Sequence, residues 1–149
     1  MRFGGAAASR LGGWLAGLWA GALLAIALLA APAAFAVLPA ADAGRVVARI
    51  FAREALASLA LSALLFVIVR QRARAAAVRG GSVVDADVLI VLGTLFCTIA
   101  GYYAVQPMMA AARAGQGPLS FGALHGMSLA FFALKGLLVM TLAWRLAAR

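Results

Sequence analysis

Three polar side chains in the last apolar stretch of the sequence are of types that form ion pairs, share hydrogen bonds or transfer protons. His125, Ser128 and Lys135 all lie between residues 121 and 144, which are otherwise mostly apolar. In a helix that turns by about 100° per residue, the three side chains fall within an arc of about 80°. A lysine inside an apolar helix is costly unless it meets a partner or reaches water, so Lys135 is a candidate functional residue.

Glu54 is the acidic residue that the sequence offers as a partner on another apolar stretch. The helical rise places it nearly level with His125 and within a lysine side chain's reach of Lys135. We therefore predict a buried Glu54–Lys135 or Glu54–His125 pair, with Ser128 nearby, and call the four residues the polar lock. Two alternatives stay open: Lys135 extends towards the inner headgroups, and His125 is a hydrogen-bonded structural residue near the outer interface.

Four apolar stretches supply the helices that must position these side chains. A bilayer core about 30 Å thick is crossed by roughly 20 apolar helical residues. The stretches cover residues 11–38, 51–69, 88–105 and 121–144. The chain is 66% hydrophobic and has 13 Lys or Arg and 4 Asp or Glu, a composition typical of membrane proteins. We expect a single domain, residues 1–149, that forms an all-α integral membrane four-helix bundle.

The first stretch also has features of a secretory signal. Arg2 and Arg10 precede it, and Ala34-Phe35-Ala36 fits a small-x-small cleavage site. The apolar region of a signal has about 7 to 15 residues, and this stretch is nearly twice as long. We therefore predict an uncleaved membrane helix.

Arginines beside the apolar stretches predict the orientation of the chain, because Lys and Arg concentrate in cytoplasmic loops. One side carries Arg2, Arg10, Arg70, Arg72, Arg74, Arg79, Arg145 and Arg149. The other side carries Arg45, Arg49, Arg53 and Arg113. The excess predicts that both termini are cytoplasmic, although the first connector opposes it. We attribute the formal net charge of +9 to these arginines at the ends of membrane helices. No nucleic-acid partner is therefore predicted.

Gly13, Gly17 and Gly21 form a glycine ridge at four-residue spacing on the first stretch. Such a ridge lets a second helix approach closely, and close contact is a main source of helix association in lipid. The ridge predicts a helix-packing surface. Its partner is either another helix of the same chain or a second molecule.

Soft metal ligands occur in the sequence, but on separate segments: Cys97, Met108, Met109, His125 and Met127. Copper-like ions favour such ligands, so metal handling belongs to one of the alternative functions that stay open. A single histidine does not supply bis-histidine haem ligation. The sequence has no Ser-His-Asp arrangement, Gly-rich phosphate loop or HExxH motif. We therefore predict no enzymatic activity, no cofactor and no metal site within one chain.

Short motifs, in order along the chain, resemble one known family. The first half carries Gly21, Ala31-Pro32, Phe35, Leu38-Pro39, Ala43-Gly44 and Phe51. The second half carries Gln106-Pro107-Met108, Arg113, Phe121-Gly122, Leu124-His125-Gly126 and Ser128. Over about residues 15–145 they resemble the transmembrane-protein-205-like family, known in bacteria as domain of unknown function 4149. The resemblance implies a small four-helix integral membrane protein with no established reaction.

The function predicted from these features is that of a structural or accessory component of the bacterial inner membrane. Its surroundings are the lipid bilayer, and its partners are a second copy or a larger membrane complex reached through the glycine ridge. The alternative is transport or handling of a small solute or metal ion across the membrane, with the Glu54–Lys135 pair serving a proton-coupled pathway.

Overall fold

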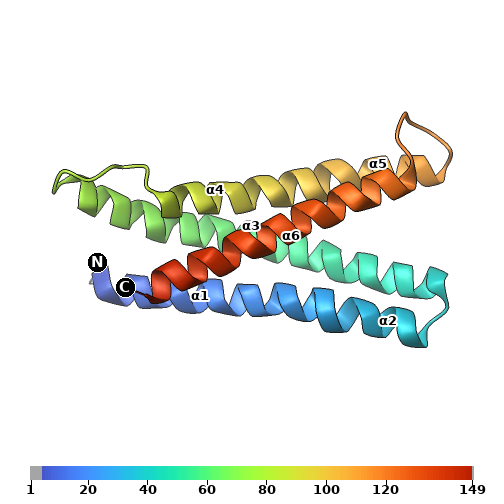
Figure 1. Ribbon diagram of the computed structural model, residues 1–149, viewed down its shortest axis with the longest axis horizontal. Helices are drawn as coiled ribbons and strands as arrows, with labels where there is room; N and C mark the ends of the chain where they lie inside the picture. Colours follow the sequence, from blue (N-terminus) through green and yellow to red (C-terminus); the bar gives the residue numbers. More distant parts are fainter. Residues whose placement is uncertain (1–4, 149) are drawn as a thin grey trace.

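The computed structural model describes residues 5–148 as four helical rods joined by short connectors (Figure 1). Arg2 and Arg149, which count towards the predicted orientation, lie outside the described residues. The rods comprise α1 (Gly5–Ala25), η1 (Ile26–Ala30) and α2 (Ala31–Val37); α3 (Ala40–Ala77); α4 (Ala86–Thr98), η2 (Ile99–Ala104) and α5 (Val105–Arg113); and α6 (Phe121–Ala147). Residues 5–148 contain no strand.

Each rod is long and apolar enough to cross a membrane, which confirms the predicted all-α class with four membrane-crossing helices. The qualifying segments are Ala7–Val37, Ala40–Ala77, Ala86–Arg113 and Phe121–Ala147. The second segment, α3, has 38 residues and extends well beyond the expected stretch 51–69. Alanine and arginine favour helix, so these residues continue α3 past its apolar part on both sides.

A core of apolar side chains closes the end of the bundle where both termini lie, which we call the packed end (Figure 1). Its buried members come from α1, α3, α4 and α6: Ala16, Leu23, Leu65, Val69, Ala73, Val88, Val91, Val139, Leu142 and Leu146. α1 lies close to α6 at Gly13, where a Cβ would be in van der Waals contact, 3.6 Å from backbone atoms of Leu146 and Ala147. Such close contact stabilises helix pairs in lipid.

The glycine ridge packs against the rest of the chain at one of its three positions. Gly13 faces α6, whereas a Cβ added at Gly17 or Gly21 would meet nothing within 4 Å. Both glycines are exposed, and so are Trp14 and Leu18 on the same helix. Within the described chain, the ridge is therefore open along α1 beyond Gly13.

The rods separate into two pairs at the opposite end, which we call the cavity end. α6 runs diagonally, with its C-terminal half beside α1 and its N-terminal half beside α5, while α2 stays with α3 (Figure 1). A second, smaller core of Val105, Met109 and Leu124 holds α5 to α6. Because α6 diverges from α3 in this way, a cavity lies between α3 and the α5–α6 pair.

Candidate functional site

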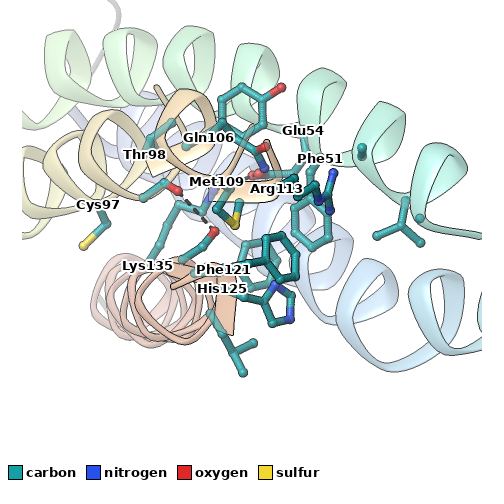
Figure 2. Close-up of a pocket in the computed structure, with 18 of the residues that line it drawn as sticks. Phe51, Glu54, Cys97, Thr98, Gln106, Met109, Arg113, Phe121, His125 and Lys135 are labelled. Carbon is teal, nitrogen blue, oxygen red and sulfur yellow. Dashed lines mark hydrogen bonds and ion pairs between the residues drawn. The ribbon is translucent and has the colours of Figure 1, made fainter. Parts of the chain in front are cut away.

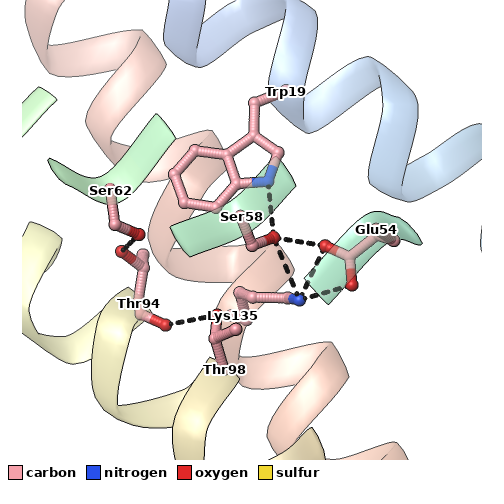
Figure 3. A network of polar contacts seen from close by, with 7 residues as sticks. All are labelled: Trp19, Glu54, Ser58, Ser62, Thr94, Thr98 and Lys135. Atoms are coloured by element: carbon pink, nitrogen blue, oxygen red, sulfur yellow. Dashed lines mark hydrogen bonds and ion pairs between the residues drawn. The ribbon is translucent and has the colours of Figure 1, made fainter. Parts of the chain in front are cut away.

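A buried ion pair lies where the packed end gives way to the cavity. Lys135 Nζ of α6 lies 2.8 Å from both carboxylate oxygens of Glu54 on α3 (Figure 3). Lys135 is 3% exposed and Glu54 9% exposed. Lys135 therefore points at Glu54 and not towards a headgroup region. Pairing of this kind offsets the large cost of holding either charge alone in an apolar interior.

Ser58 extends the pair into a network across three helices. Its Oγ donates to Glu54 Oε1, and it accepts from Lys135 Nζ at 3.3 Å and from Trp19 Nε1 at 3.2 Å (Figure 3). A lysine ammonium has three N–H donors. Glu54 and Ser58 supply three acceptor oxygens, so all the donors of Lys135 are used within the chain.

Sequence reasoning missed Trp19 as a member of this network. The signal for it was present, since a buried indole N–H usually finds an acceptor, and Trp19 is 3% exposed. A neighbouring contact joins α3 to α4, where Ser62 Oγ and Thr94 Oγ1 are 3.4 Å apart. Hydroxyl contacts between helices are a common source of association in membranes.

His125 and Ser128 lie elsewhere, so the predicted polar lock is wrong for these two residues. The His125 ring is exposed and stacks on Phe121 at 5.9 Å between centroids. Ser128 Oγ donates to the carbonyl of Gly101 at 3.2 Å. The helical rotation that aligned them with Lys135 is correct, but the N-terminal half of α6 diverges from α3. Both side chains line the cavity without contacting Glu54, and Ser128 contacts η2.

The cavity has a volume of about 400 Å³ and is apolar over most of its wall. Glu54 and Lys135 lie at its inner end, next to the packed end, and Arg113, Phe121 and His125 lie at its outer end, with Phe51 and Met109 between (Figure 2). Phe132 also lines the cavity. Small-molecule sites in proteins typically have volumes of roughly 300–1,000 Å³ and a few polar groups on mostly apolar walls. The cavity has the size and lining of such a site.

A cationic and aromatic stack forms the outer end of the cavity. The Arg113 guanidinium lies 4.5 Å from the centroid of the Phe121 ring, on which His125 also stacks (Figure 2). Arginine over an aromatic face is a favourable cation–π contact. Among the described residues that line the cavity, Glu54 is the one acidic side chain, and Lys135 already compensates it. The outer end therefore has an excess of positive charge.

The segment η2 forms one wall of the cavity and is held tightly to α6. A Cβ added at Gly101 would lie 2.5 Å from Phe131 Cβ, so only glycine permits this approach. η2 is a π-helical turn, and such turns occur often at functional sites. Ser128 donates a hydrogen bond to the carbonyl of Gly101 in this turn.

The packed end has an ion pair of its own that the sequence did not reveal. Arg145 Nε of α6 lies 2.6 Å from Asp87 Oδ1 of α4. The Asp87 side chain is 1% exposed and that of Arg145 is 34% exposed. Asp87 is buried on α4 together with Thr94 and Thr98, so the buried polar residues of this helix make a charge contact as well as hydroxyl contacts.

The soft ligands of the sequence are divided between the cavity and the surface. Cys97, Met109 and His125 line the cavity, while Met108 and Met127 are exposed. Cys97 points away from His125 in Figure 2. Across residues 5–148, no three His, Cys, Asp or Glu side chains form a group suited to a metal ion.

Comparisons with known proteins give a family and no close relative. No curated protein and no solved structure matches the chain. The family model described as Domain of unknown function (DUF4149) matches residues 14–117. The matched residues include Glu54 and Arg113 and end before Phe121, so the second-half motifs from Phe121 to Ser128 lie outside the match. Because the match covers more than two thirds of the 149 residues, the chain belongs to the DUF4149 family.

Proposed function

We propose that this chain is a multi-pass protein of the bacterial inner membrane that holds a small, mainly apolar molecule in the cavity, without enzymatic activity. The observation that carries this proposal is the cavity of about 400 Å³ between α3 and the α5–α6 pair, with a compensated ion pair at its inner end. Sites between helices of a bundle are a frequent place for ligands.

The complete hydrogen bonding of the Glu54–Lys135 pair favours a binding role for the cavity over a catalytic one. Every donor of Lys135 already has an acceptor within the chain, so Lys135 is held as a fixed part of the wall. A buried pair with its hydrogen bonds complete orders the groups around it, and it provides no free acid or base. The cavity supports handling of a small solute, the alternative suggested by the sequence, over a purely structural role.

The proposal also includes the orientation of the chain in the membrane and its relation to a wider family. The excess of arginines on one side supports cytoplasmic termini, which would direct the cavity towards the opposite face of the membrane. The motifs Gln106-Pro107-Met108 and Leu124-His125-Gly126 support a relation to the transmembrane-protein-205-like family.

A cavity-filling substitution tests the proposed function. Gly44 lines the cavity, and a Cβ added there would meet nothing within 4 Å, so Gly44→Leu places a side chain in the open space. Gly122→Leu is the matched control, because Gly122 is equally open but does not line the cavity. We expect mass spectrometry of the purified proteins to find a small molecule with the wild type and with Gly122→Leu. Gly44→Leu should lose it. Equal recovery from all three proteins would overturn the proposal.

The second candidate is the structural role, favoured by the open part of the glycine ridge. Gly17 and Gly21 face away from the chain beside exposed Trp14 and Leu18, a surface that fits a second copy of α1. Single cysteines at Gly17 or Gly21, with Cys97→Ser, should form a crosslinked dimer in membranes. A cysteine at exposed Leu137 of α6 is the control. Absence of a dimer from either α1 position would rule out this contact.

A further inference from the structure

The charges around the cavity distinguish its two ends. At the inner end, Glu54 and Lys135 cancel each other, and the three donors of Lys135 are already used. At the outer end lies Arg113, which takes part in none of the ion pairs found among residues 5–148. A charged group entering the cavity therefore meets uncompensated positive charge only at the outer end.

Arg113 is arranged to bind an anion. The face of its guanidinium lies over Phe121, which leaves the N–H groups on its edge available. Guanidinium N–H groups match the paired oxygens of carboxylates and phosphates, and such charge-assisted bonds are stronger than neutral ones. His125, on the same aromatic ring, brings a second nitrogen group to this end of the cavity.

The inner part of the cavity suits one apolar chain. Phe51, Met109 and Phe132 line it, and His125 and Lys135 are ten residues apart on α6. At 1.5 Å per residue, this separation gives a depth of about 15 Å. A volume of about 400 Å³ is near the lower limit for ligand sites, which favours a single chain over a lipid with two.

We propose that the ligand of the cavity is a single-chain amphiphile with an oxyanion head group, such as a fatty carboxylate or an alkyl phosphate. This inference rests on the proposed function. The head group binds Arg113 and His125, and the chain extends towards Lys135. Lys135 does not bind the head group, because its release from Glu54 would leave a buried carboxylate uncompensated.

Equilibrium binding to the protein in phosphatidylcholine nanodiscs tests the inference. The probes are tritiated laurate, dodecyl phosphate and dodecanol, which share a twelve-carbon chain and differ in the head group. Nanodiscs containing Gly44→Leu measure partition into lipid, and this background is subtracted. We expect laurate and dodecyl phosphate to bind above background and dodecanol to bind at least ten-fold more weakly, about the effect of one charge-assisted hydrogen bond. The tighter of the two anions identifies the head-group class.

Substitutions at Arg113 locate the head group. Arg113→Gln should weaken binding of both anions by about ten-fold and leave dodecanol unchanged, since only the charge contact is lost. Arg113→Lys should restore most of the affinity. Arg79→Gln, on the connector at the packed end, is the matched control and should have no effect. Unchanged dodecanol binding also shows that Arg113→Gln is folded.

Two negative results separate this inference from the function on which it rests. Dodecanol binding as tightly as laurate, with no effect of Arg113→Gln, overturns the anionic ligand and leaves a cavity that binds apolar molecules. No binding of any probe above the Gly44→Leu background overturns the anionic ligand. If copurified molecules are also the same in wild type and Gly44→Leu, the proposed function fails with it.

Discussion

The two ends of this bundle use the same four rods in different ways. At the packed end, small and aliphatic side chains such as Ala16, Leu65 and Val139 are fully buried among four helices. At the cavity end, the helices pack mainly as the pairs α2–α3 and α5–α6. Larger polar and aromatic side chains line the space between them, where Phe51 of α3 meets Phe132 of α6 edge to face. In lipid, helices gain little from burying apolar surface and associate through close contact and hydrogen bonds. Separation of α3 from the α5–α6 pair is therefore enough to form a cavity.

The Glu54–Lys135 pair marks the boundary between these regions. Its replacement should have the largest effect on stability. Lys135→Met leaves Glu54 buried and uncompensated and should lower the free energy of unfolding by about 3–5 kcal/mol. The measurement is reversible unfolding in mixed micelles, followed by tryptophan fluorescence.

The double variant Glu54→Gln, Lys135→Met is the control for this prediction. It removes both charges and keeps a polar partner for Ser58, so it should recover most of the lost stability. A single variant as stable as the wild type would show that the pair does not join the two regions.

Close contact at the cavity end depends on Gly101. Gly101→Ala places a Cβ 2.5 Å from Phe131 Cβ and should lower the free energy of unfolding by about 1–3 kcal/mol, through a forced shift of η2 from α6. Gly126→Ala, on α6 with open space around it, should have no such cost. Equal stability of the two variants would mean that η2 moves freely on α6.

The packed end should be less sensitive to loss of its ion pair. Asp87→Asn weakens the contact with Arg145, whose side chain is 34% exposed, so water screens the interaction. We expect a loss of about 1 kcal/mol in the same unfolding assay. Asp42→Asn, which alters an exposed pair with Arg45, should cause no measurable change. A loss for Asp87→Asn as large as that for Lys135→Met would contradict the comparison.

The smallest effect is expected at Ser128. Ser128→Ala removes the hydrogen bond to the Gly101 carbonyl and should cost about 0.6 kcal/mol, the average for interhelical bonds in membranes. Thr141→Ala removes an exposed bond within α6 itself and serves as the control. If the two substitutions have equal effects, the contact between η2 and α6 does not depend on Ser128.

Apolar length and helical rise predict much of this molecule from its sequence. They predict four membrane-crossing helices, and they place Glu54 within reach of Lys135, with which it is in contact in the structure. These quantities depend on one helix at a time, because rise and rotation per residue are nearly constant.

The features that could not be predicted depend on how helices cross. His125 and Ser128 share a helix face with Lys135 but lie against different neighbours, since the diagonal course of α6 separates its N-terminal half from α3. The angle at which two helices cross depends on how their side chains fit together. The residue pattern of each helix taken alone does not determine that fit. The cavity and the contact between Arg145 and Asp87 depend on the same crossings.

The separation of Glu54 and Lys135 along the chain has a consequence for biosynthesis. The two residues are 81 positions apart. At about 5–20 residues per second, the ribosome adds the lysine roughly 4 to 16 s after the glutamate. During that interval the nascent chain has the carboxyl group of Glu54 in its second membrane segment without the lysine that pairs with it in the finished bundle. Insertion of the last segment thus completes the ion pair and the assembly.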